Sequence, residues 1–168
     1  YDLFEESKVG TIFTHGDPQS NLSNQLAGVD LNLRSSNWWN EQSVSWHGFY
    51  MTSDDENENS DDVIGTHFTF PNYPFRASGH WVRTGEIFNP ALGFVRRRGG
   101  ESTGLGFTYY FEQPENELLE DISVGAEYDR YEWLDGDLDS DELEINLIGI
   151  RTLAGDFLGL EVEFERDI

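Results

Sequence analysis

Apolar residues alternate with polar or very small residues in nine short stretches of the chain, and the connections between these stretches vary in length. The clearest stretch is Gln25–Leu33. One side of it carries Ala27, Val29, Leu31 and Leu33, and the other carries Leu26, Gly28, Asp30 and Asn32. Successive side chains of a β-strand point to opposite faces of a sheet. The pattern therefore predicts a strand with one apolar face and one face that is wet or tightly packed.

Repeated along the chain, the alternation predicts an all-β fold, an antiparallel up-and-down meander of about eight to nine strands that forms a β-barrel or part of one. The expected strands are Lys8–His15, Gln25–Arg34, Gln42–Met51, Val63–Phe70, Phe75–Arg83, Thr103–Phe111, Ile122–Tyr131, Leu143–Arg151 and Phe157–Glu165. Residues 1–168 are expected to form a single domain. The chain starts at Tyr1 without an initiator Met, so we expect a processed product or an excerpt of a longer chain. Nine strands are too few for a large closed barrel, which favours an excerpt unless one stretch is misread and eight strands close a small barrel.

Nearly every predicted strand contributes to the apolar face. Its members include Val44, Trp46, Tyr50, Ile64, Phe68, Phe70, Leu105, Phe107, Tyr109, Phe111, Ile122, Val124, Ala126, Tyr128, Leu143, Ile145, Leu147, Leu158, Leu160, Val162 and Phe164. The opposite face includes Ser43, Ser45, His47, Gly104, Gly106, Thr108, Ser123, Gly125, Glu127, Glu144, Asn146, Glu161 and Glu163. The apolar face is expected to meet either lipid or a protein core.

Two features favour lipid. The connections Gly16–Asn24, Thr52–Asp62, Thr84–Ser102 and Glu132–Glu142 are long, whereas Pro71–Pro74 and Leu153–Asp156 are tight. In a meander, one rim then carries long loops and the other short turns, as in transmembrane β-barrels. Aromatic residues also gather near the strand ends, which suits a bilayer interface. The alternative is that these rings cap a soluble core.

Composition narrows the range of partners. The chain has 10 Lys+Arg against 33 Asp+Glu, a formal charge of -23, which argues against nucleic acid because phosphate binding needs basic clusters. The absence of cysteine excludes disulfides and thiolate chemistry. No apolar run approaches the roughly 18 residues of a membrane helix. The expected partners are membrane lipid or a carbohydrate ligand.

The most distinctive segment is Phe88–Gly100, which holds three adjacent arginines, Arg96, Arg97 and Arg98. It resembles a segment of the form F-N-P-x-x-G-F-V-P-R-R-G that links two barrel strands in a bacterial family. Members of that family join an N-terminal carbohydrate-binding-like (family 9) domain to a C-terminal outer-membrane-type β-barrel of unassigned function. The matching residues are Phe88, Asn89, Pro90, Gly93, Phe94, Val95, Arg97, Arg98 and Gly99, and Arg96 stands where the family has Pro.

Lys8–His15, Gln25–Leu33 and Glu161–Arg166 also resemble strands of that family's barrel. The resemblance thus covers most of the chain but lacks the N-terminal domain and the remaining strands. It implies a segment of a bacterial outer-membrane barrel with a structural, transport or carbohydrate-binding role. A secreted or periplasmic location is the alternative. The family offers no established functional residues to carry over.

The three arginines have two interpretations. Planar guanidinium donors suit carboxylates, so Arg96–Arg98 can form a lumen constriction or a site for an acidic sugar. They can instead staple the longest loop to nearby Asp or Glu, which the acidic excess favours. His47 and Trp81 complete the set of candidate ligand-binding residues.

Alternate carboxylates at Asp135, Asp137, Asp139 and Asp141 resemble the start of a calcium loop. An EF-hand is excluded because Ser140 and Asn146 occupy the positions that need Gly and Glu, and no helices flank the loop. A weak, loop-held calcium ion is possible, and solvated acidic loops are the default. No other cofactor is expected.

Catalysis has the least support. The histidines at 15, 47, 67 and 80 stand apart in the sequence, and zinc needs three or four convergent ligands. Carboxylate pairs such as Glu127 with Glu144, or Glu161 with Glu163, suit glycoside hydrolysis in principle, but so acidic a chain contains such pairs by chance. We therefore do not predict an enzyme. A soluble barrel that binds a sugar or small ligand is the alternative function, and a small carboxylate-dependent hydrolase is a further one.

Overall fold

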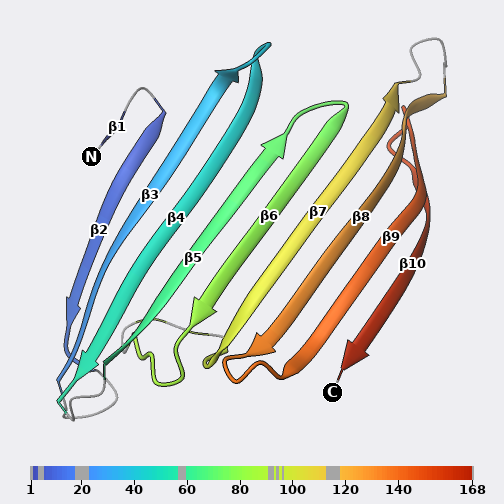
Figure 1. The fold of residues 1–168 in the computed structure, drawn as a ribbon. Helices are drawn as coiled ribbons and strands as arrows, with labels where there is room; N and C mark the ends of the chain where they lie inside the picture. The colour runs from blue at the N-terminus through green and yellow to red at the C-terminus, as the bar shows by residue number, and fades with distance from the viewer. Residues whose placement is uncertain are drawn as a thin grey trace.

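The computed structural model describes residues 2–3, 6–17, 23–56, 60–90, 93, 95, 97–112 and 118–167. These residues form one antiparallel sheet of ten strands in sequence order (Figure 1). The strands are β1 (Asp2–Leu3), β2 (Ser7–His15), β3 (Asn24–Trp38), β4 (Gln42–Asp55), β5 (Ser60–Pro71), β6 (Phe75–Thr84), β7 (Gly100–Glu112), β8 (Leu119–Trp133), β9 (Leu138–Thr152) and β10 (Phe157–Asp167). The predicted all-β meander is confirmed, and each of the nine expected strands is present.

Several strands are longer than their alternation predicted. β4 runs to Asp55 and β5 begins at Ser60, so much of the expected loop Thr52–Asp62 is paired strand, with Asp54 opposite Ser60. Most of Glu132–Glu142 is likewise paired, because β8 ends at Trp133 and β9 begins at Leu138. The sequence did not predict these extensions because they are rich in Asp and Glu, which have a low strand propensity. The backbone groups of these residues are nevertheless hydrogen-bonded in the sheet. The predicted rim of uniformly long loops was therefore wrong at these two connections.

The sheet is open. Among the described residues, β10 pairs only with β9, and β2 has only the two-residue β1 on its outer side. A barrel or part of one is consistent with this arrangement. No helix in the described part of the chain is long and apolar enough to cross a membrane.

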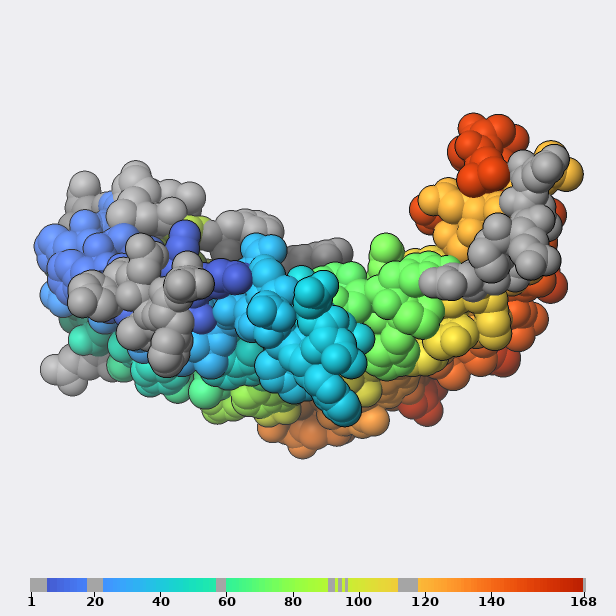
Figure 2. Space-filling model, turned by 90° about the horizontal axis from the view of Figure 1, so that it is seen from above, coloured from blue at the N-terminus to red at the C-terminus, as the bar shows by residue number. Residues whose placement is uncertain are grey.

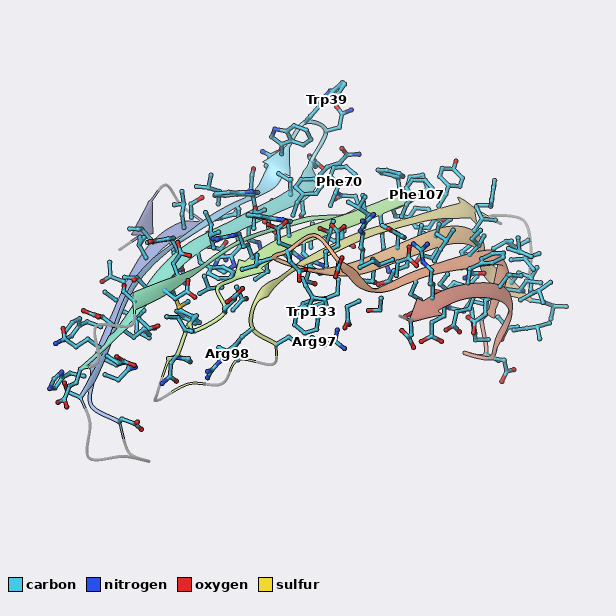
Figure 3. The ribbon with its side chains drawn as sticks, turned by 60° about the horizontal axis from the view of Figure 1, so that its bottom comes forward. Trp39, Phe70, Arg97, Arg98, Phe107 and Trp133 are labelled. Carbon is cyan, nitrogen blue, oxygen red and sulfur yellow. The ribbon has the colours of Figure 1, made fainter. Side chains whose placement is uncertain are left out.

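Register places the predicted apolar residues on one face. Trp46 lies opposite Phe68, and across the later strands Leu105 lies opposite Tyr128 and Tyr128 opposite Leu143. Figure 2 shows that the sheet is bent into a trough. Phe70 and Phe107 lie on the convex side, whereas Arg97 and Arg98 lie beneath the arch on the concave side (Figure 3). The apolar face is therefore the convex face.

The buried core is small and lies on the concave side. It consists of Leu26 on β3, Val63 on β5 and Phe88 from the connection 85–99, with Phe49, Met51, Val82 and Val95 packed around them. By contrast, many large apolar side chains of the convex face are exposed, among them Leu105, Phe107, Leu158, Leu160 and Phe164. The alternation along the strands thus produces an apolar surface rather than a core.

Candidate functional site on the concave face

The connection 85–99, which we call the arginine loop, packs against the concave face. The ring of Phe88 is only 2% exposed and anchors the loop over β3 and β5. The next residue is held at both backbone groups, because the Asn89 amide donates to Ser53 Oγ at 2.9 Å and its carbonyl accepts from Asn24 Nδ2 at 3.1 Å. The loop is therefore part of the concave wall and not a free extension of the rim.

Two of the three arginines are tied to that wall. Arg97 forms an ion pair with Asp139 at 2.6 Å, and its guanidinium lies 4.8 Å from the ring centroid of Tyr131. The Arg98 carbonyl accepts a hydrogen bond from the Tyr131 hydroxyl at 3.4 Å, and Arg98 Nη2 donates to Asn89 Oδ1 at 3.5 Å. Arg96 lies outside the described residues. These contacts match the staple interpretation, with the arginine loop bridged to β8 and β9.

A row of histidines crosses the same face. His47 on β4 lies directly opposite His67 on β5, which lies opposite His80 on β6. The rings of His67 and His80 are stacked with centroids 6.5 Å apart. Sequence spacing made these residues look isolated, and only the strand register brings them together.

Carboxylates stand at both ends of the histidine row. His47 Nε2 lies 3.9 Å from Asp30 Oδ2, and His80 Nε2 lies 4.0 Å from Asp129 Oδ1. His80 reaches Asp129 across Gly104, where a Cβ would come within 2.2 Å of the imidazole. No set of three or more His, Cys, Asp or Glu side chains within the described ranges is placed to hold a metal ion.

Trp81 does not join this site. It lies on the convex face of β6, and its indole Nε1 donates to Glu101 Oε2 at 3.3 Å. The structure therefore does not bring Trp81 together with His47 and the arginines, because Trp81 and His80 are adjacent in one strand and point to opposite faces. Trp81 marks the boundary between apolar and charged residues on the convex side.

Three of the four carboxylates proposed for calcium make other contacts. Asp139 pairs with Arg97, and Asp141 pairs with Arg166 at 2.5 Å on the convex face. Asp135 Oδ1 accepts the backbone amide of Asp137 at 3.1 Å, which stabilises the β8–β9 turn. A calcium ion would have to displace two arginines, and weak calcium binding stays a prediction.

Two residues of the concave face escaped the sequence analysis. Arg76 on β6 and Tyr110 on β7 lie together, with Arg76 Nη1 donating to the Tyr110 hydroxyl at 3.2 Å and the guanidinium 4.8 Å from the ring centroid. Arg76 lies opposite Thr108, so its place on the polar face follows from register. The alternation of side chains along a strand could have identified Arg76, because it puts Arg76, Ser78 and His80 on the same side of β6.

Comparisons with known proteins show no relative of this chain: no family model, no curated protein and no solved structure matches it.

Proposed function

We propose that this sheet is part of the wall of an outer-membrane-type β-barrel, with its convex face against lipid and its concave face lining a lumen. The observation that carries the proposal is the exposed apolar convex face. Leu105 is 59% exposed and Leu158 is 70% exposed, whereas the buried apolar core of the described residues contains only Leu26, Val63 and Phe88. Contiguous apolar surface of this extent marks a membrane or protein interaction site.

The dimensions of the strands fit a bilayer. A tilted strand needs about 9–11 residues to cross the hydrocarbon core. The shortest of the nine main strands has 9 residues and the longest have 15. Each of them is therefore long enough to span a membrane.

The ends of the apolar band also fit the two membrane interfaces. One border on the convex face carries ion pairs, with Arg83 lying 3.2 Å from Asp62 and Arg166 bonded to Asp141. Towards the opposite ends of the strands the rings are in mutual contact, as in the Phe70–Phe75 and Tyr109–Phe111 pairs, whose centroids lie 5.8 Å and 4.8 Å apart. Charged groups in water and aromatic rings at an interface are the borders that a lipid-facing band requires.

Curvature argues against the main alternative. A soluble barrel that binds a small ligand places its apolar face inward, on the concave side. Here the concave side carries His47, His67, His80 and many carboxylates, and apart from the small core around Phe88 the large apolar residues lie on the convex side. A structural or transport role follows from a polar lumen, and carbohydrate binding stays a prediction.

The open edges require further strands. In hydrocarbon, every backbone N–H and C=O must be paired, so a sheet crosses a membrane only when it is closed. All eleven residues of β10 are exposed and its outer edge is unpaired within the described structure. We infer that additional strands pair with β10 and β2 to complete the wall.

A pair of single-cysteine variants tests the proposal, because the chain has no cysteine of its own. Phe107→Cys and Thr108→Cys place a fluorophore on opposite faces of β7 at nearly the same height. In lipid vesicles, we expect nitroxide lipids to quench the label at 107 and aqueous iodide to quench the label at 108. If nitroxide lipids quench neither label, or if the label at 107 is shielded from both quenchers, the convex face does not meet lipid.

A further inference from the structure

A hollow of about 360 Å³ lies on the concave face over β5–β9, separate from the arginine loop. Its floor includes Gly106 on β7 and Gly125 on β8, which leave the backbone uncovered. A Cβ at Gly106 would lie 2.8 Å from Ser78 Oγ, and one at Gly125 would lie 2.7 Å from the Phe107 carbonyl oxygen. The space thus depends on glycine at both positions.

One wall of the hollow presents a positive charge. Arg76 is held by the hydrogen bond to the Tyr110 hydroxyl and by the Tyr110 ring beneath its guanidinium. None of the ion pairs among the described residues includes Arg76. A guanidinium has five N–H donors, so Arg76 is oriented while most of its donors remain available.

The opposite wall presents negative charge. Glu127 on β8 lies directly opposite Glu144 on β9, and Glu144 lies opposite Glu163 on β10. The ion pairs of the described chain include none of these three carboxylates. Like charges directly across a strand pair destabilise a sheet, so a cation bound between Glu127 and Glu144 relieves a repulsion.

The two walls are a short distance apart. Arg76 and Glu127 stand on strands separated by β7, which places their backbones roughly 10 Å apart across the sheet. Both side chains extend into the hollow from its opposite sides. A span of two strand spacings suits a small molecule that carries opposite charges at its two ends.

We propose that this hollow binds a small zwitterion, an amino acid or dipeptide. Its carboxylate pairs with Arg76, for which a planar guanidinium offers two parallel hydrogen bonds. Its ammonium group donates to Glu127 and Glu144. The hydroxyls of Thr69, Ser78 and Thr108 line the space between and supply polar contacts to a peptide group. The inference uses only the concave face and holds whether or not the convex face meets lipid.

Glycylglycine is the probe for the test, with the folded full chain in detergent and binding measured by isothermal titration calorimetry. Two matched analogues each lack one charge: glycylglycinamide keeps the ammonium, and N-acetylglycylglycine keeps the carboxylate. We expect saturable binding of glycylglycine and binding of each analogue that is weaker by about tenfold or more, since each loses a charged hydrogen-bonded pair. Absence of glycylglycine binding, or equal binding of either analogue, overturns the proposal.

Variants locate the site. Arg76→Gln and Glu144→Gln are each expected to weaken glycylglycine binding by about tenfold or more. The Arg76→Gln variant is also expected to bind glycylglycine and glycylglycinamide, which lacks the carboxylate, equally well. Gly106→Val fills the hollow and abolishes binding, whereas Gly79→Ala, on the convex face of β6, leaves it unchanged. Circular dichroism checks that each variant is folded, and unaltered binding in folded Arg76→Gln and Glu144→Gln refutes the assignment.

Discussion

Substitution of Phe107 changes the free energy of unfolding by different amounts in a lipid-facing sheet and in a soluble barrel, and so distinguishes the two. Phe107 lies in the middle of the convex band, opposite Ala77 on β6 and Ala126 on β8, and is 43% exposed. Its ring packs on that of Phe75, with centroids 4.6 Å apart and planes inclined at 55°. Three substitutions separate the contribution of the ring from the cost of a charge. Phe107→Ala removes the ring, Phe107→Arg adds a charge, and Thr108→Arg adds the same charge on the other face.

The two environments predict different costs for Phe107→Ala. Against lipid, the acyl chains fill the space left by the ring, and the free energy of unfolding falls by only the ring–ring term of about 0.5–1.5 kcal/mol. In a protein core the same change leaves a cavity and costs about 3–5 kcal/mol. Phe107→Arg is expected to cost about 2–4 kcal/mol beyond Phe107→Ala, which is the cost of a cation on the lipid face near the membrane midplane.

Equilibrium unfolding in urea, followed by tryptophan fluorescence in lipid vesicles, measures these differences. Thr108→Arg is the matched control and is expected to change the free energy of unfolding by at most about 0.5 kcal/mol, because its side chain faces the lumen. A loss of 3 kcal/mol or more for Phe107→Ala would place the ring in a core. Equal stabilities of Phe107→Arg and Phe107→Ala would also refute a lipid-facing position.

Three other outcomes follow from particular contacts. Arg97→Gln breaks an ion pair and a ring contact and should speed amide hydrogen exchange in 85–99, whereas Arg98→Gln, with one long hydrogen bond, should have little effect. Gly104→Val overpacks the histidine row and should lower the free energy of unfolding by about 1–3 kcal/mol in a urea titration. Hydrogen bonds from Ser23 hold the pKa of Glu56 below its ordinary value of 4.5, so they stabilise the fold above pH 4.5 and this stabilisation is lost as the pH falls through the lowered pKa. Ser23→Ala removes the stronger, side-chain hydrogen bond and keeps the backbone one, so it should weaken that acid-dependent step in amide exchange near Glu56.

Most of the fold was predictable because the strand period is a local property. Stretches such as Gln25–Leu33 alternate strictly, and every predicted strand exists. The alternation was less informative where acidic residues interrupt it. Residues 52–55 and 138–142 were predicted to be loop, yet they pair with their neighbouring strands, because a backbone ladder forms regardless of the charge on the side chains.

The candidate site was only partly predictable. The arginine loop was recognisable from its three adjacent arginines. An ion pair such as that of Arg97 with Asp139 was expected because the chain has many more acidic than basic residues. The histidine row did not stand out, since His47, His67 and His80 lie far apart in sequence and meet only through the register of β4, β5 and β6.

By itself, the sequence determined that the chain forms strands and that each strand has one apolar and one polar side, because both properties depend on the order of neighbouring residues. The tertiary structure decided which way the sheet bends, and so made the apolar face convex (Figure 3). It also decided which residues of different strands come together, including Arg76 and Glu127, which line the same hollow. Curvature and register arise from twist and pairing summed over many strands, and no single stretch of sequence contains that sum.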